Sequence, residues 1–186
     1  MTKFALAHAT GTEWKTICEQ CLAELGPVET PGGLEPLGLV YITDDLAGDT
    51  EDILTFLRDE TGVADWVGSV GMGICATGQE YFDQPAIAIL ITQFPQDSFR
   101  LLSTRKSPGI LPVTLANWAQ ERESTFGVVH ADPRNGDILE IIAELADRLG
   151  SFLVGGLTSS RGELAQISGD VTSAGVSGVL LAGDIP

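Results

Sequence analysis

The chain contains the same succession of structural signals twice: an apolar strand, a helix, a second apolar strand and a glycine-rich corner. Residues 37–41 (LGLVY) are matched by residues 126–130 (FGVVH), and Val67-Gly68 is matched by Val154-Gly155. A nearly constant spacing with small slips is typical of an old duplication. We therefore expect a single domain over residues 1–186, with an internal repeat at about residues 37–94 and 126–184.

The order of the elements within each repeat predicts the fold class. Apolar residues at helical spacing separate the two strands: Ile53, Leu54 and Leu57 in the first repeat, and Ile138, Ile141, Ile142, Leu145 and Leu149 in the second. Strand, helix and strand in this order imply a parallel pair with a right-handed crossover. The apolar strand after each corner is expected to run antiparallel. The prediction is an α/β fold in which duplicated β-α-β-β units form mixed sheets covered by helices, with Ile142 fully buried.

Several polar segments are interpreted as turns and helix caps. Residues 75–84 (CATGQEYFDQ) and 161–170 (RGELAQISGD) have the composition of turns. Asp49 and Asp137 each precede a helix and are expected to cap it. Residues 97–103 (DSFRLLS) fit either an additional strand or one helical turn.

Charge and cysteine content exclude several classes of partner. The net charge is −16 and no basic patch is visible, so binding to nucleic acid is not expected. No run of 18 apolar residues is present, which argues against membrane insertion. Three cysteines, an odd number, do not form a disulfide framework, and a cytoplasmic location is expected.

The sequence predicts no metal site. Cys18 and Cys21 form a C-x-x-C pair, but both fall in the middle of a predicted helix, on its apolar face, and no second pair is available for zinc. The acidic segment 44–52 does not have the register of a calcium-binding loop. We interpret the two cysteines as buried core residues, and expect Cys75, which follows a glycine corner, to be exposed.

The glycine corners allow a structural and a functional interpretation. Glycine permits a tight bend or a close backbone approach. Unshielded N–H groups beside hydroxyl side chains can also receive a small polar molecule, and a carboxylate or other small anion suits them. The candidate ligand-binding residues are Gly68, Ser69, Gly71, Gly73, Gly155, Gly156, Thr158 and Tyr41.

Three comparable side chains lie where apolar strands end. They are His8, Tyr41 and His130, and the two histidines are the only ones in the chain. Because ligands of open α/β sheets bind beyond the carboxyl ends of the strands, we expect these residues near one rim, together with both corners. A hydrogen-bonded structural role is the alternative for each histidine. No Walker loop or nucleophile elbow is present, so the sequence predicts a protein that is not an enzyme.

Residues 66–74 (WVGSVGMGI) and the segments LVGGLTSS and GVSGVLLAGD resemble the N-terminal FIST domain family in composition and order. The resemblance implies a sensory module of bacterial signal-transduction proteins that binds a small ligand such as an amino acid. Family members usually carry a C-terminal FIST domain, and we expect this chain to be an N-terminal module without it. The expected partners are therefore a small molecule and either that domain or a separate signalling protein.

Three functional hypotheses follow. The first is a sensory domain, without catalytic activity or cofactor, that binds a small polar ligand. The second, implied by haem-binding relatives that sense nitric oxide, uses haem as a cofactor with His130 or His8 as the iron ligand. The third is an amidohydrolase-like enzyme that uses a Ser or Thr at a glycine corner, because a catalytic triad is defined by geometry and not by sequence order.

Overall fold

The computed structural model describes residues 4–104, 113–123, 125–183 and 185. The first half contains β1 (Phe4–Thr10), α1 (Trp14–Leu25), β2 (Leu34–Thr43), the 3-10 helix η1 (Asp44–Asp49), α2 (Thr50–Thr61), β3 (Asp65–Gly71), β4 (Gly73–Ala76), β5 (Gln79–Phe82) and β6 (Ala86–Pro95). The second half contains β7 (Phe99–Ser103), α3 (Val113–Gln120), β8 (Thr125–Ala131), α4 (Ile138–Leu149), β9 (Phe152–Leu157), β10 (Gln166–Ser168), β11 (Asp170–Thr172) and β12 (Val176–Ala182).

The two main sheets have corresponding strand orders. The first has the order β1-β6-β2-β3-β10-β11, and the second has the order β7-β12-β8-β9. In the first sheet, β2 pairs antiparallel with β6 and parallel with β3. In the second sheet, β8 pairs in the same way with β12 and β9. The α/β class with mixed sheets is thus confirmed. In these orders β1 of the first sheet has the same place as β7 of the second. The internal duplication itself stays a prediction.

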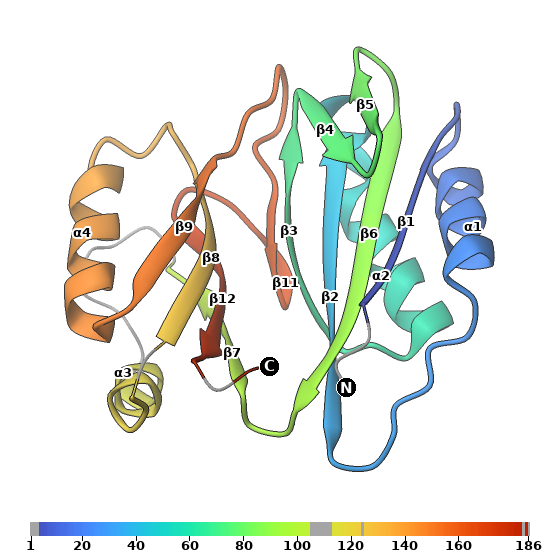
Figure 1. Ribbon diagram of the computed structural model, residues 1–186. Coiled ribbons are helices and arrows are strands. Elements are labelled where there is room, and N and C mark those ends of the chain that lie inside the picture. The colour runs from blue at the N-terminus through green and yellow to red at the C-terminus, as the bar shows by residue number, and fades with distance from the viewer. Residues whose placement is uncertain (1–3, 105–112, 124, 184, 186) are drawn as a thin grey trace.

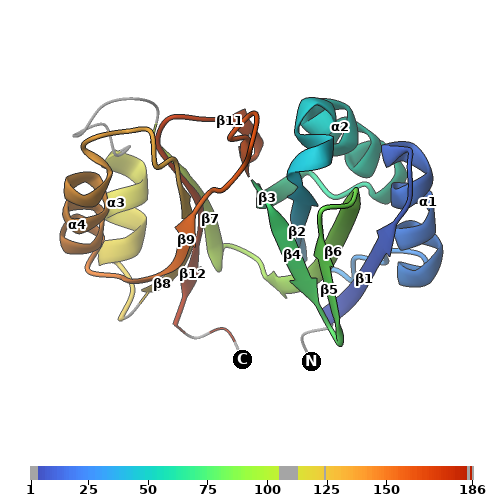
Figure 2. The ribbon, with the colours of Figure 1, turned by 90° about the horizontal axis from the view of Figure 1, so that it is seen from above.

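The molecule has four layers, with helices outside and the two sheets inside (Figures 1 and 2). Helices α1 and α2 cover the outer face of the first sheet, and α3 and α4 cover that of the second. The inner faces meet through an apolar cluster that contains Leu37, Val67, Phe94, Phe99 and Val179. Because side chains alternate between the two faces of a strand, every second residue along these strands also points into the space between the sheets.

Two segments interpreted as turns are β-hairpins instead. Residues 75–84 contribute to β4 and β5, and residues 161–170 contribute to β10 and β11. Their strands have only three or four residues, too few for a clear alternating pattern. The turns contain Gly78 and Gly169, both in the left-handed region with φ of 76° and 72°. In addition, β10 joins β3 in the first sheet, a long-range pairing that no local pattern predicts.

Other local predictions are corrected or confirmed. Asp49 and Asp137 occupy the N-cap positions, but neither side chain makes a capping hydrogen bond. Ile142 is only partly buried, because the buried stripe of α4 consists of Ile138, Ile141, Leu145 and Leu149. Residues 99–103 form a strand, β7.

The predicted roles of the cysteines are confirmed. Cys18 and Cys21 are fully buried in α1, and burial raises the pKa of each thiol to about 12. Cys75 is exposed. The described part of the chain contains no helix long and apolar enough to cross a membrane.

Candidate functional site

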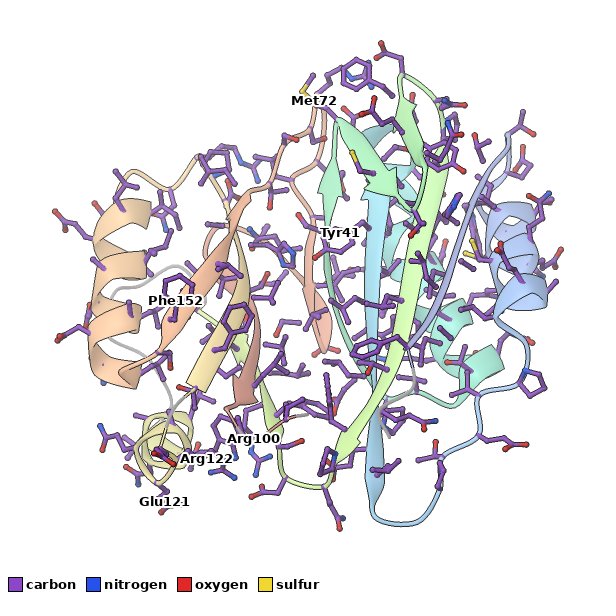
Figure 3. All side chains as sticks on the ribbon, viewed as in Figure 1. Tyr41, Met72, Arg100, Glu121, Arg122 and Phe152 are labelled. Carbon is purple, nitrogen blue, oxygen red and sulfur yellow. The ribbon has the colours of Figure 1, made fainter. Side chains whose placement is uncertain are left out.

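Two rows of side chains face each other between the sheets. In the first sheet, consecutive register partners form the row His8, Ala88, Tyr41, Ser69, Gln166 and Thr172. In the second sheet they form the row Ser103, Ser177, His130 and Gly156. Paired residues of neighbouring strands point to the same face of a sheet, and both rows continue the inner faces that the apolar cluster defines. Polar groups from distant segments therefore share one layer, with Tyr41 between the sheets (Figure 3).

Hydrogen bonds connect the two rows. Tyr41 Oη lies 3.1 Å from His130 Nε2, and the two rings meet nearly edge to face. Ser69 Oγ lies 2.9 Å from Thr158 Oγ1, which also accepts a 3.0 Å bond from Gln166 Nε2. Two of the three predicted strand-end residues are thus in contact, and so are the hydroxyls of the two corners.

A further hydrogen bond joins the two glycine corners, and another fixes the second corner to the end of β8. The N–H of Met72 donates to Ser159 Oγ over 3.2 Å, and the N–H of Thr158 donates to the carbonyl of Ala131 over 2.8 Å. Both corners therefore lie at the same end of the two sheets, as the sequence predicts.

Three buried polar atoms of this layer have no hydrogen-bond partner among the described residues: His130 Nδ1, Gln166 Oε1 and Ser177 Oγ. Ser177 is the direct cross-strand neighbour of His130. An unpaired buried polar group costs about 1–3 kcal/mol, so such atoms are normally paired with water or a ligand. We call these three residues, together with Tyr41, Ser69 and Thr158, the polar layer. The polar layer offers both hydrogen-bond donors and hydrogen-bond acceptors.

The polar layer is uncharged at neutral pH. Burial lowers the pKa of His130 to about 4 and raises the pKa of Tyr41 above its ordinary value. The remaining members are hydroxyls and an amide. A buried anion would find no cation here to offset its desolvation, so the layer suits an uncharged polar molecule better than the carboxylate expected from the sequence.

The pKa of His130 predicts a pH dependence of stability. Because this pKa is about 4 in the folded state and 6.5 ordinarily, the unfolded chain takes up the proton first as the pH falls. We expect full stability above pH 6.5 and a loss of about 3 kcal/mol between pH 6.5 and 4. Urea unfolding at a series of pH values measures this change in the free energy of unfolding. His130→Gln should flatten the profile above pH 5, where the lowered carboxyl pKa values have no effect. A slope in this variant equal to that of the wild type would contradict the assignment.

Four of the predicted glycines have structural roles. A Cβ atom on Gly68 would lie 1.8 Å from the carbonyl oxygen of Val40, and one on Gly155 would lie 1.8 Å from that of Val129. A Cβ on Gly71 or Gly73 would meet the backbone or side chains of the following hairpin. Such contacts require glycine for close approach.

Gly156 differs from the other predicted glycines. It is the register partner of His130, it is exposed, and a Cβ there would meet no atom within 4 Å. Gly156 therefore lies beside open space, next to His130 in the second row.

His8 lies apart from the other two strand-end residues. Its Nδ1 is 2.6 Å from the hydroxyl of Tyr81 on the β4–β5 hairpin. Ala88 separates it from Tyr41 within the row. His8 thus fixes the hairpin to β1, which is the structural alternative that the sequence left open.

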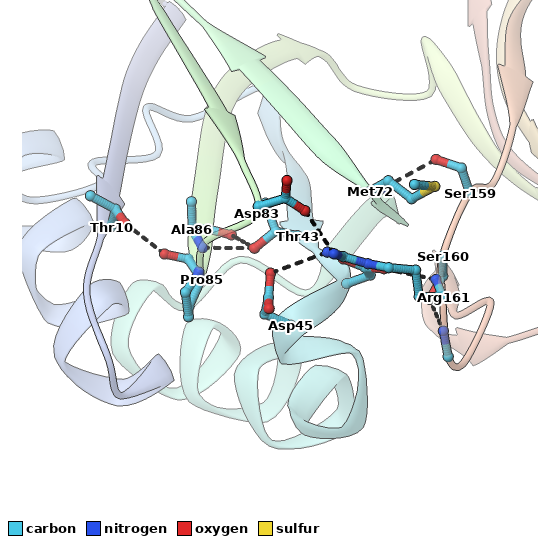
Figure 4. A network of polar contacts seen from close by, with 12 residues as sticks. Thr10, Thr43, Asp45, Met72, Asp83, Pro85, Ala86, Ser159, Ser160 and Arg161 are labelled. Atoms are coloured by element: carbon cyan, nitrogen blue, oxygen red, sulfur yellow. Dashed lines mark hydrogen bonds and ion pairs between the residues drawn. The ribbon is translucent and has the colours of Figure 1, made fainter.

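An ion-pair cluster, which the sequence did not predict, closes the end of the layer. Arg161 donates to both carboxylate oxygens of Asp44, over 2.8 and 2.6 Å, and to Asp83 over 2.7 Å. Figure 4 shows Arg161 between Asp45 and Asp83. The guanidinium keeps the pKa of Asp44 below its usual range. Because its donors bind these carboxylates, Arg161 joins the loop after β9 to the first half of the chain.

A surface hollow of about 340 Å³ adjoins the far end of the first row at Thr172. Its lining includes Glu51, Arg134 and Glu163. Arg134 already pairs with Asp132 over 2.9 Å. The hollow is charged, in contrast to the polar layer, and it would suit a different kind of ligand.

The described residues contain no group of three or more His, Cys, Asp or Glu side chains placed to hold a metal ion. The geometry of His130 also does not fit an axial haem ligand as it stands, because Nε2 is bonded to Tyr41 and Nδ1 is enclosed by protein. Haem binding would require this ring to leave its position.

The fold and the polar layer together define a mixed α/β domain with buried, uncharged polar side chains between two sheets. Residues 36–186 match the family model for the FIST N domain, and the chain belongs to that family. FIST domains are sensory domains of signal-transduction proteins. A search of curated proteins found no match to the chain.

Proposed function

We propose that this domain senses a small, uncharged polar molecule that binds in the polar layer, and that it does so without catalysing a reaction. The observation that carries the proposal is the set of three buried, unpartnered polar atoms on the facing rows. A molecule with both a donor and an acceptor, such as an amide or a hydroxyl compound, would pair with them. An amino acid would have to keep its charged ends outside the layer, for example toward Gly156.

The contacts of the candidate nucleophiles support a binding role over an amidohydrolase. Ser69 and Thr158 are bonded to each other, and neither is bonded to the buried His130, which contacts Tyr41 instead. A serine or threonine nucleophile needs a base within hydrogen-bond reach. This geometry also favours ligand binding over the haem alternative.

A ligand in this position would act on both halves of the domain. It would contact β8 and β12 of one sheet and β10 of the other, so its binding would favour one spacing of the sheets over others. We propose that a signalling partner, either a C-terminal FIST domain or a separate protein, detects this difference. Three free cysteines support a cytoplasmic location for the domain.

A thermal-shift screen of neutral polar compounds and amino acids tests the proposal. A ligand at about 100 times its Kd stabilises the folded state by about 2.7 kcal/mol. Ser177→Ala removes one unpartnered atom, so we expect weaker binding, by about tenfold or less, without a loss of stability in the absence of ligand. Ser103→Ala, the same change one strand further along the row, is the control.

Two results would contradict the proposal. One is a screen in which no neutral polar compound stabilises the protein. The other is a compound that binds Ser177→Ala and the blocked variant Gly156→Val as tightly as the wild type, which would place its site elsewhere, for example in the charged hollow beside Thr172.

A further inference from the structure

Within the part of the chain that the structure describes, strand β9 forms a free edge of the second sheet and pairs with β8 alone. Its apolar side chains are exposed: Phe152 by 71% and Leu157 by 57%. Leu139 at the start of α4 is 77% exposed. Figure 3 labels Phe152 on β9, and its ring lies 6.2 Å from that of Phe126 on β8. Natural proteins usually protect such an edge with lysine, proline or a bulge, and β9 has no lysine or proline.

The corresponding strand of the first sheet shows how such an edge is covered. Strand β3 pairs antiparallel with β10, with Gly68 opposite Ile167. The N–H of Val70 donates to Ala165 over 3.0 Å, and the N–H of Gly169 donates to Trp66 over 2.9 Å. The backbone groups of residues 66, 68 and 70 therefore point away from β2 toward the added strand.

Strand β9 has the same backbone geometry as β3, because Gly155 of β9 corresponds to Gly68 of β3. Gly68 and Gly155 make the same close approach to the preceding parallel strand. Residues 153, 155 and 157 of β9 thus correspond to residues 66, 68 and 70 of β3. Their N–H and C=O groups point to the free side, where no described strand meets them.

We propose that β9 pairs antiparallel with β9 of a second copy of this chain, about a two-fold axis at Gly155. This register aligns Leu153 with Leu157 of the other copy and Val154 with Gly156 of the other copy. The outward-pointing residues 153, 155 and 157 of one copy then lie opposite residues 157, 155 and 153 of the other in a continuous hydrogen-bonded ladder. A two-fold interface needs a self-complementary patch, and this register supplies one.

The charge distribution favours a second copy at this edge over other places on the surface. Residues 151–160 contain no charged side chain, although the whole chain carries −16. Two copies brought together elsewhere would oppose acidic surfaces. The remaining long-range repulsion is screened at high ionic strength, so the dimer should be stronger in high salt than in low salt.

Sedimentation velocity over a range of protein concentrations, at low and high salt, tests the dimer. The expected result is a concentration-dependent dimer that high salt strengthens and that Leu157→Lys weakens at least tenfold. Leu6→Lys, on the free edge strand β1 of the first sheet, should leave it unchanged. A monomer under all conditions would overturn the proposal, and so would a dimer that Leu157→Lys does not weaken.

Disulfide trapping locates the contact independently of these variants. In a Cys75→Ser background, Val154→Cys combined with Gly156→Cys should give a covalent dimer, because these positions lie directly opposite each other across the axis. Val154→Cys alone should cross-link much less. Equal cross-linking of both variants would mean that the register is wrong. All of these measurements are made without ligand, so their outcome is independent of the sensing proposal.

Discussion

Gly68→Ala and Gly155→Ala are each expected to reduce the free energy of unfolding by about 3 kcal/mol or more. The new Cβ atom would lie 1.8 Å from a backbone carbonyl oxygen, that of Val40 or Val129, and neither strand can yield without disrupting its sheet. Gly155 also has a φ of 147°, which side-chain-bearing residues rarely adopt. Urea unfolding followed by circular dichroism measures the loss.

Gly156→Ala is the matched control for these two variants. It introduces the same methyl group one residue away, where a Cβ atom meets nothing within 4 Å. We expect a change of no more than about 0.5 kcal/mol, the usual size at an unconstrained surface position. If Gly155→Ala were as stable as Gly156→Ala, the close approach of β8 and β9 would be wrong.

Trp66→Ala should cost about 3–5 kcal/mol, because it removes the largest fully buried side chain of the first core. The indole ring lies over Gly38, where a Cβ atom would come within 2.3 Å of it, and its Nε1 donates to the carbonyl of Val63 over 2.9 Å. Trp14→Ala, at a partly buried position of the same cluster, should cost clearly less. Equal losses in the two variants would contradict the packing described here. Urea unfolding of both proteins gives the comparison.

Much of the fold could be predicted because its main elements carry strong periodic signals. The apolar spacing in α2 and α4 and the near-continuous apolar runs of β2, β6 and β12 identify the two crossover units. The hairpins β4–β5 and β10–β11 were missed because their strands are only three or four residues long. The pairing of β10 with β3 depends on how the two halves pack, and a one-dimensional pattern contains no information about that.

The candidate site divides in the same way. Tyr41, Ser69, His130 and Thr158 could be proposed from the sequence, because polar residues at strand ends and beside glycine corners are conspicuous. Gln166 and Ser177 could not, since Gln166 lies in a segment interpreted as a turn and Ser177 lies within an otherwise apolar strand. Only the meeting of the two inner faces brings their unpartnered atoms into the layer that contains His130.

The glycines also show why one residue type in one motif can have different roles. Gly68 and Gly155 lie opposite a carbonyl group, and their side-chain-free surface is required by the parallel strand beside them. Gly156 lies beside open space, and a side chain there would meet no neighbouring atom within 4 Å. From the sequence alone, Gly155 and Gly156 were both candidate ligand-binding residues.

The most direct test of the sensing proposal is an NMR titration of the histidine rings with the most stabilising compound from the screen. The chain has only two histidines, so His130 reports on the polar layer and His8 serves as an internal reference outside the proposed contacts. We expect the ring ¹⁵N resonances of His130, Nδ1 above all, to shift with ligand concentration and to saturate, while those of His8 stay in place. Ring resonances of His130 that remain unchanged at a saturating concentration of ligand would contradict the claim that the polar layer is the binding site.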